Sequence, residues 1–222
     1  PLLNELSSFL TQNQFDLKAL MREILRSETY QRSSQVLPQN KQDDRFYSRF
    51  YPRRLMAEVL LDAISQVSDV PTAFQQIEHK GADIRATKEY PLGTRATELY
   101  DSAVLSSFLS KFGRNNRDIV CECERTNKPS LVQVLHIVNG ATINEKLKSK
   151  KSCVEVAIGK PVKSNETIIR EAFLKTVARE PTTHEKISLL EIIEQAGPDD
   201  RRTAIEDLYW SLMSSREFLF QH

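Results

Sequence analysis

Two cysteines separated by a single residue make the sharpest chemical pattern in the chain, Cys121-Glu122-Cys123. Side chains two positions apart share one face of a β-strand, so both thiols could bind one metal ion, with His136 or Cys153 as further ligands. Structural zinc sites usually leave two or more residues between paired cysteines, which favours two small buried side chains instead. A disulfide from Cys153 to either of the two is a third interpretation. We therefore expect neither a metal nor another cofactor, and Cys121, Cys123 and His136 remain the candidate metal ligands.

Two glutamates, Glu122 and Glu124, lie on the opposite face of the same predicted strand. Carboxylates about one pleat repeat apart can divide acid and base roles, because close like charges raise the pKa of one of them. Arg114, Arg117 and Arg125 lie nearby in sequence, and their charges would neutralise these carboxylates. The pattern therefore favours a network of ion pairs, and it leaves Glu122 and Glu124 as candidate catalytic residues.

A third candidate catalytic carboxylate, Glu58, lies in a predicted helix over residues 53–67. Arg54, Glu58 and Asp62 are spaced by four, so they form a charged ridge beside the apolar face of that helix. We interpret this ridge first as a structural tie to a neighbouring loop. The residues expected to form a structural polar network are Arg53, Arg54, Glu58, Arg114, Asp118 and Arg125.

The rest of the sequence lacks the patterns of common catalytic sites. The histidines, His79, His136, His184 and His222, are scattered, and none lies beside a serine or cysteine in a known nucleophile setting. The sequence contains no glycine-rich phosphate loop and no pair of cysteines followed by histidine for haem attachment. These absences favour a non-catalytic role over an enzyme.

The charge balance argues against a strongly basic binding surface. The 222 residues include 31 lysines and arginines against 30 acidic residues, which gives a formal net charge of +1. The short basic clusters are not interleaved with aromatic residues, so we expect no nucleic-acid partner. No uninterrupted apolar run is long enough to span a bilayer. The chain opens on Pro1 in a helix-like segment without an initiating methionine, which predicts a piece of a longer protein.

Helical periodicity and capping residues dominate both ends of the chain. Asp16 precedes a predicted helix with one apolar stripe. The stripe is formed by Leu17, Leu20, Met21, Ile24 and Leu25. Near the other end, Ser164 is expected to cap one helix, and Thr182 with Glu185 forms a capping box for the next. Gly197-Pro198 is expected to end that helix.

The middle of the chain contains weaker signals. Ser130 or Thr126 is expected to cap a helix that ends at Gly140, and Thr142 with Glu145 to cap the following short helix. Residues 146–163 are expected to form a lysine-rich connection. We also expect the cysteine face of the strand near residue 121 to pack on the helix over residues 131–138.

Together these signals predict a mainly α protein, an irregular helical domain with a small β or extended insertion. We expect one domain over residues 1–222, helical over 1–68, extended or irregular over 69–125, and helical over 126–222. The insertion is predicted because long periodicity is missing there and proline and glycine interrupt it.

Five segments, in this order, resemble a known family. They are FDLKALMREILRSETYQRSS, FYPRRLMAEVLLDAI, PLGTRA, FGRNNRDIVCECERTNKPSLVQVLHIVNGATINEKL and IEDLYWSLMSSREFLFQH. The chain is similar to the C-terminal domain of unknown function found in large secreted proteins of planctomycetes and related bacteria. The residues that match the family's motifs are Arg53, Arg54, Glu58, Asp62, Arg95, Gly113, Arg114, Cys121, Cys123, Glu124, Arg125, Pro129, Asn139 and Gly140.

The resemblance implies an exported, periplasmic or extracellular protein in which a second uncharacterised domain precedes this one. It also implies an association with a cytochrome-c-like, haem-carrying module. The expected function is a structural or interaction module of a multidomain protein, which docks on the preceding domain or on other chains of its assembly. The alternative is a hydrolytic or carbohydrate-processing enzyme whose site lies at the seam with the preceding half, with Glu122 and Glu124 contributing.

Overall fold

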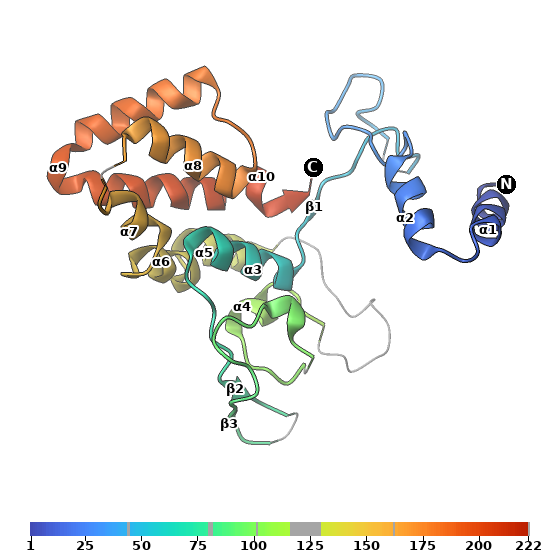
Figure 1. Cartoon of the computed structure of the whole chain (residues 1–222), viewed down its shortest axis with the longest axis horizontal. Helices are drawn as coiled ribbons and strands as arrows, with labels where there is room; N and C mark the ends of the chain where they lie inside the picture. Colours follow the sequence, from blue (N-terminus) through green and yellow to red (C-terminus); the bar gives the residue numbers. More distant parts are fainter. Residues whose placement is uncertain (44, 80–81, 101, 116–129, 162, 222) are drawn as a thin grey trace. The chain divides into compact units, whose positions relative to one another are not determined.

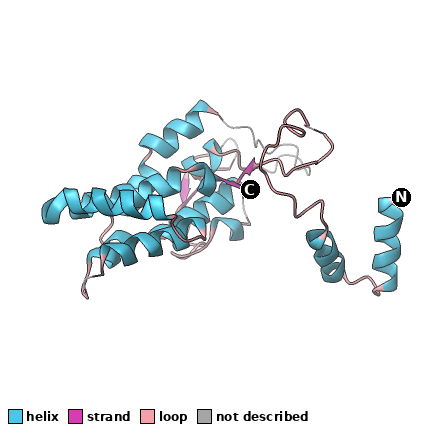
Figure 2. Cartoon of the chain, turned by 90° about the horizontal axis from the view of Figure 1, so that it is seen from above, coloured by secondary structure: helices cyan, strands magenta, loops and turns pink. Residues whose placement is uncertain are grey.

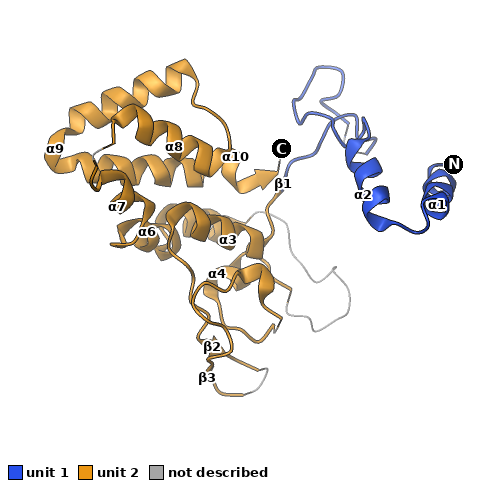
Figure 3. Ribbon diagram, viewed as in Figure 1, with its two compact units in different colours: residues 1–53, 222 blue, residues 54–221 orange. Residues whose placement is uncertain are grey.

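A computed structural model describes residues 1–43, 45–79, 82–100, 102–115, 130–161 and 163–221. The chain divides into two compact units, residues 1–53 and residues 54–221 (Figure 3). The single domain predicted over residues 1–222 is not tested by this division and stays a prediction.

Unit 1 begins with two helices, α1 (Leu2–Gln12) and α2 (Leu17–Arg26). Asp16 caps α2 as predicted, because its Oδ1 accepts hydrogen bonds from the backbone N–H groups of Lys18, at 2.8 Å, and Ala19, at 3.1 Å. Neither helix contains a buried residue. A long connection over residues 27–52 follows, in which the carboxylate of Asp43 accepts hydrogen bonds from the backbone of Phe46 and Ser48.

Unit 2 has the hydrophobic core. Its central helix is α3 (Ala57–Ser68), which begins four residues later than the helix predicted over 53–67, because Arg53 and Arg54 form strand β1 (Arg53–Arg54). Strand β1 pairs with β4 (Phe220–Gln221). The α3 residues that are buried are Ala57, Leu60, Leu61, Ile64, Val67 and Ser68. The strand that leads into α3 is therefore paired with the strand at the C-terminal end of unit 2.

The C-terminal half of unit 2 is a group of helices in which α8 (Asn165–Val177) packs against α9 (Thr183–Ser214) (Figure 1). Ser164 caps α8, and Thr182 with Glu185 forms the predicted capping box of α9. The two arms of α9 meet at Gly197, whose φ of 68° is a conformation that glycine adopts without strain. The break predicted at Gly197-Pro198 is confirmed as a kink. Helix α10 (Arg216–Leu219) then leads into β4.

The segment between α3 and the C-terminal helices is irregular. Strands β2 (Gln76–Ile77) and β3 (Arg85–Ala86) form an antiparallel pair, followed by the 3-10 helix η1 (Ala96–Glu98) and the short helix α4 (Ser107–Lys111). Between η1 and α4, Val104 forms an isolated antiparallel β-bridge with Ile77. The predicted strand around Cys121 and its packing on the following helix lie outside the described residues.

Helices α5 (Leu131–Asn139), α6 (Ala141–Lys148) and α7 (Cys153–Ile158) come before α8 in the chain and contribute buried residues to the same core. Of the two predicted caps of α5, Ser130 is the one that the structure shows. Gly140, and not Thr142, is the N-cap of α6. The connection predicted over residues 146–163 is wrong in part, because it contains the end of α6 and all of α7. Ser152 caps α7, and Val154 and Ala157 bury its inner face.

The fold class is confirmed, since helices dominate and the strands are two residues long (Figure 2). Within the described residues, no helix combines the length and the apolar character needed to cross a bilayer.

Candidate functional site

Part of the predicted polar network comes together around Phe112. Arg54 is 7% exposed, and its guanidinium donates a 2.8 Å hydrogen bond to the carbonyl of Phe112. The guanidinium carbon of Arg54 also lies 5.3 Å from the centre of the Phe112 ring, in a cation–π geometry. Burial lowers the pKa of Arg54. Arg54 therefore fastens the start of unit 2 to the end of α4.

Glu58, the candidate catalytic carboxylate of α3, lies beside Arg114. The Nε of Arg114 is 3.9 Å from Oε1 of Glu58, and only 14% of the Glu58 side chain is exposed. This ion pair joins α3 to the segment after α4, as expected of a structural tie. A catalytic role of Glu58 stays a prediction. Arg53 belongs to unit 1, and the other expected partners, Asp118 and Arg125, lie outside the described residues.

The candidate metal ligands are only partly described, because Cys121 and Cys123 fall within residues 116–129. His136 lies at the end of α5, with its ring edges toward Phe108 and Phe112, at 5.6 and 5.9 Å between ring centres. Its Nε2 is 2.9 Å from the hydroxyl of Thr142, and burial, followed by the nearby charge of Lys111, lowers the pKa of the imidazole.

Cys153 is buried in α7, and burial raises the pKa of its thiol to about 11. The thiol is therefore protonated at neutral pH and unreactive as a nucleophile. Within the described part of the chain, Cys153 forms no disulfide, and no cluster of three or more histidine, cysteine or acidic residues could bind a metal ion. The candidate carboxylates Glu122 and Glu124 lie outside that part and stay predictions.

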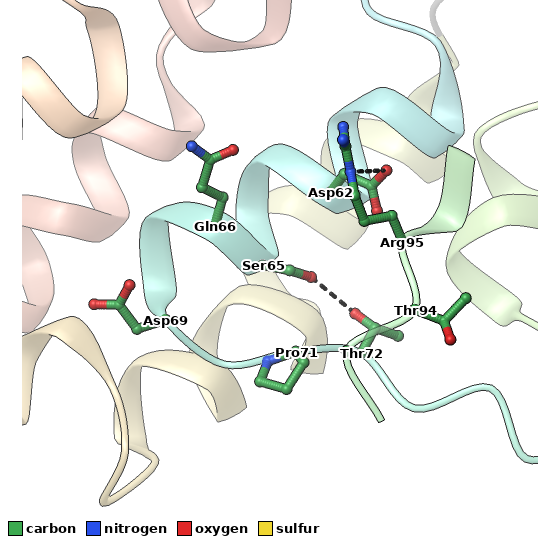
Figure 4. A pocket seen from close by; sticks show the side chains of 9 residues that line it. Asp62, Ser65, Gln66, Asp69, Pro71, Thr72, Thr94 and Arg95 are labelled. Carbon is green, nitrogen blue, oxygen red and sulfur yellow. Dashed lines mark hydrogen bonds and ion pairs between the residues drawn. The ribbon is translucent and has the colours of Figure 1, made fainter. Parts of the chain in front are cut away.

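A polar pocket of about 420 Å³ lies between the outer face of α3 and the segment before η1 (Figure 4). Its lining is rich in hydroxyl, amide and carboxylate groups. The lining residues are Asp62, Ser65, Gln66, Asp69, Pro71, Thr72, Gly93, Thr94 and Arg95. The hydroxyl groups of Ser65 and Thr72 are 3.0 Å apart, and the side chains of Asp62 and Arg95 approach each other (Figure 4).

Both carboxylates of this pocket already have strong partners. Asp62 accepts hydrogen bonds from the backbone N–H of Ala96, at 2.6 Å, and from the N–H and hydroxyl of Thr97, at 3.1 and 2.8 Å. Asp69 lies 2.6 Å from the ammonium of Lys175. Sequence reasoning placed Asp62 on a charged ridge but missed its partners, because they lie more than thirty positions away. We interpret Asp62 and Asp69 as ties that hold the irregular segment and α8 to α3.

Helix α2 exposes four of the five residues of the predicted apolar stripe, while Leu20 is half-buried. The exposed fractions are 60% for Leu17, 61% for Met21 and 46% for Leu25. The opposite face carries Arg22 and Arg26, so the helix is strongly amphipathic. An apolar helix face of this kind normally packs against another apolar surface.

Helix α5 also exposes apolar side chains. Leu131 is 73% exposed, and Val134, Leu135 and Val138 are between 41% and 54% exposed, while Gln133 and Ile137 face the core. Gln133 helps to hold α5, because its side-chain amide donates a 3.0 Å hydrogen bond to the carbonyl of Lys111. The helix is therefore anchored on one side and apolar on the other.

Comparison with known proteins finds one family. A model described as "PSD1: Protein of unknown function (DUF1553)" matches residues 1–193. No curated protein and no solved structure matches the chain. The matched range includes α1 and α2 of unit 1 and most of unit 2. The chain therefore belongs to the PSD1 family of proteins of unknown function (DUF1553).

Proposed function

We propose that the chain is a non-catalytic interaction module of an exported multidomain protein, and that it docks through the apolar stripe of α2 on the domain that precedes it in the same polypeptide. The observation that carries this proposal is the exposure of Leu17 and Met21, 60% and 61%, on a helix with no buried residue. An isolated helix of ten residues is marginal in water, because its few backbone hydrogen bonds barely offset the cost of nucleation. Burial of its apolar face is the usual source of the missing stability.

The occupant is inferred from the position of the stripe in the chain. Helices α1 and α2 are the first two elements in the chain order. The sequence resemblance described above implies a preceding domain. Leu2 and Leu3 of α1 are also exposed, at 72% and 79%.

Burial on docking would be energetically useful. Full burial of a leucine or methionine side chain contributes about 1.5–3 kcal/mol. Part of this gain offsets the loss of side-chain freedom and of relative motion between the domains. Several such side chains along α1 and α2 therefore suffice for a stable contact within one polypeptide, where the effective concentration is high.

The test uses the longer polypeptide, which contains the preceding domain followed by this chain. It compares this polypeptide with a variant in which the apolar stripe of α2 is made polar. Leu17→Glu and Met21→Glu, introduced together, should detach unit 1 from the preceding domain and expose the segment around α2 to limited proteolysis. Arg22→Glu and Arg26→Glu on the opposite face make a matched control that should leave cleavage unchanged. Equal protection of the stripe variant and the parent protein would contradict the proposal.

Localisation is part of the proposal and has its own test. We propose a periplasmic or extracellular location, and an antibody against the chain should find it in that fraction of the source cells. Recovery in the cytoplasmic fraction would contradict it. A c-type cytochrome is the other partner implied by the resemblance, and it would be detected as haem absorbance that copurifies with the protein in a stripe-dependent way.

A further inference from the structure

Lys146 of α6 is buried although its side chain ends in an amine. Only 9% of the residue is exposed, and its Nζ donates a 2.6 Å hydrogen bond to the carbonyl of Val70, just after α3. Other lysines of unit 2 form ion pairs, namely Lys163, Lys175 and Lys186. Within the described part of the chain, no carboxylate forms such a pair with Lys146. A buried amine without a counter-charge is costly to keep protonated.

Lys146 and Val70 line a cavity of about 440 Å³ between α3, α4 and α6. Leu61 and Phe108 contribute apolar wall from α3 and α4. Thr142 lies one turn before Lys146 on the same face of α6, and its hydroxyl is 2.9 Å from Nε2 of His136. The volume suits a small molecule, and the walls combine apolar surface with a few polar groups, as ligand sites usually do.

Burial also changes the chemistry of the amine. Desolvation lowers the pKa of Lys146 from 10.5 to about 8. At pH 7 about a tenth of such an amine is neutral, against roughly one part in 3,000 for a lysine with a pKa of 10.5. Only the neutral amine has a lone pair, so a desolvated lysine in a pocket is the form that attacks carbonyl groups.

We propose that this cavity, the Lys146 cavity, binds small neutral hydroxylated aldehydes or ketones, and that Nζ of Lys146 forms a Schiff base with their carbonyl carbon. The lone pair of Nζ attacks the carbonyl carbon, the π electrons move to the oxygen, and one amine proton passes to that oxygen. The hydroxyl then leaves as water with the second amine proton, and a C=N bond remains. Amine and carbonyl give imine and water, so no oxidant or reductant is needed.

The lining decides which carbonyl compounds fit. Hydroxyl groups of Thr72, Ser106, Thr142 and Ser149 can pair with hydroxyl groups of the ligand. The carboxylate of Glu145, on the rim, disfavours an anionic ligand such as a 2-oxo acid. The proposal concerns a site separate from the α2 stripe and does not depend on docking.

The test is reductive trapping of the whole chain with glycolaldehyde and cyanoborohydride at pH 7, followed by peptide mass spectrometry. We expect adduct formation at Lys146 to exceed that at the exposed Lys148 and Lys150 by tenfold or more. The expected rate at Lys146 rises from pH 7 to pH 9. Among the described residues, the titratable groups that face the cavity beside Lys146 are Glu145 and, through Thr142, His136, since the described lining from α3, α4 and residues 70–72 has none.

Two comparisons make the outcome decisive. Glyoxylate, of similar size but anionic, should label Lys146 at least fivefold less than glycolaldehyde does, and equal labelling would overturn the assigned ligand class. Lys146→Arg keeps a donor to Val70 and should abolish the major adduct, while Lys148→Arg, the matched control, should retain it. If Lys146→Arg does not fold, the comparison of adduct formation at Lys146, Lys148 and Lys150 in the parent chain still tests the proposal. Adduct at Lys146 at or below the level at Lys148 and Lys150 would overturn the proposal.

Discussion

Arg179 and Glu217 are 38 positions apart in sequence and form two hydrogen bonds of 2.7 and 2.9 Å. The same guanidinium donates to both carboxylate oxygens of Glu185 in the N-terminal turn of α9, and it lies 5.1 Å from the ring centre of Phe173. One side chain thus joins α8, α9 and α10.

Removal of this junction should weaken unit 2. Arg179→Ala is expected to lower the free energy of unfolding by about 1 kcal/mol, a value reduced because the side chain is 36% exposed and its ion pairs are partly screened by solvent. Arg170→Ala removes an exposed pair with Glu180 and is the matched control, with little expected change. Urea unfolding of the two variants measures the difference. Equal loss in both would show that the junction does not stabilise the fold.

The same junction predicts an acid dependence. Hydrogen bonds from Arg179 lower the pKa of Glu185 from 4.5 to about 2. A carboxyl whose pKa is lower in the folded state stabilises the protein above its unfolded pKa, and this contribution is lost as pH falls from 4.5 toward 2. The stability difference between the parent chain and Glu185→Gln should therefore shrink across that range. A difference that stays constant from pH 5 to pH 2.5 would contradict this account.

Lys146 predicts a rise of stability with pH as well, but in the alkaline range. Its pKa, lowered to about 8, means that the unfolded chain binds more protons than the folded chain between pH 8 and 10.5, so stability rises with pH there. The shift corresponds to roughly 3 kcal/mol over the full range. Lys146→Met should lose this rise relative to the parent chain, while the exposed Lys148→Met should keep it. Parallel curves for Lys146→Met and the parent chain between pH 7 and 10 would refute the lowered pKa.

Asp62 should be important for the irregular segment of unit 2. Asp62→Ala leaves the N–H groups of Ala96 and Thr97 without their acceptor, and we expect a loss of about 1–2 kcal/mol in stability. Asp62→Asn should cost less, because the amide oxygen can still accept one of these hydrogen bonds. Gln66→Ala, on the exposed side of α3, is the neutral control. Thermal unfolding measures the stability of these variants. A lower stability of Asp62→Asn than of Asp62→Ala would contradict the role assigned to Asp62.

Local sequence signals predicted the elements that depend on neighbouring residues. Asp16, Ser130, Ser164 and Thr182 are caps as expected, because a cap is completed within three residues of itself. The kink at Gly197 followed from the same kind of local signal. Thr142 was misread because its hydroxyl bonds His136, a partner in the preceding helix.

Long-range partners could not be read from the sequence. The bond from Lys146 to Val70 spans 76 positions, and no local pattern shows that an amine is buried. The sequence predicted that Glu58 and Arg114 belong to one polar network, but it did not predict that these two residues form an ion pair with each other. For α2, periodicity predicted the apolar stripe correctly, but its exposure depends on what the stripe packs against.

The docking of α2 is the central claim, and the accessibility of a single thiol tests it most directly. Met21→Cys places the thiol on the stripe, and Arg22→Cys places it on the opposite face as a control. Alkylation at each position, followed by peptide mass spectrometry, is compared between the chain alone and the longer polypeptide. If α2 docks through its stripe, the alkylation rate at position 21 falls roughly tenfold or more in the longer polypeptide, and the rate at position 22 does not change. Equal rates at position 21 in both proteins would contradict this claim.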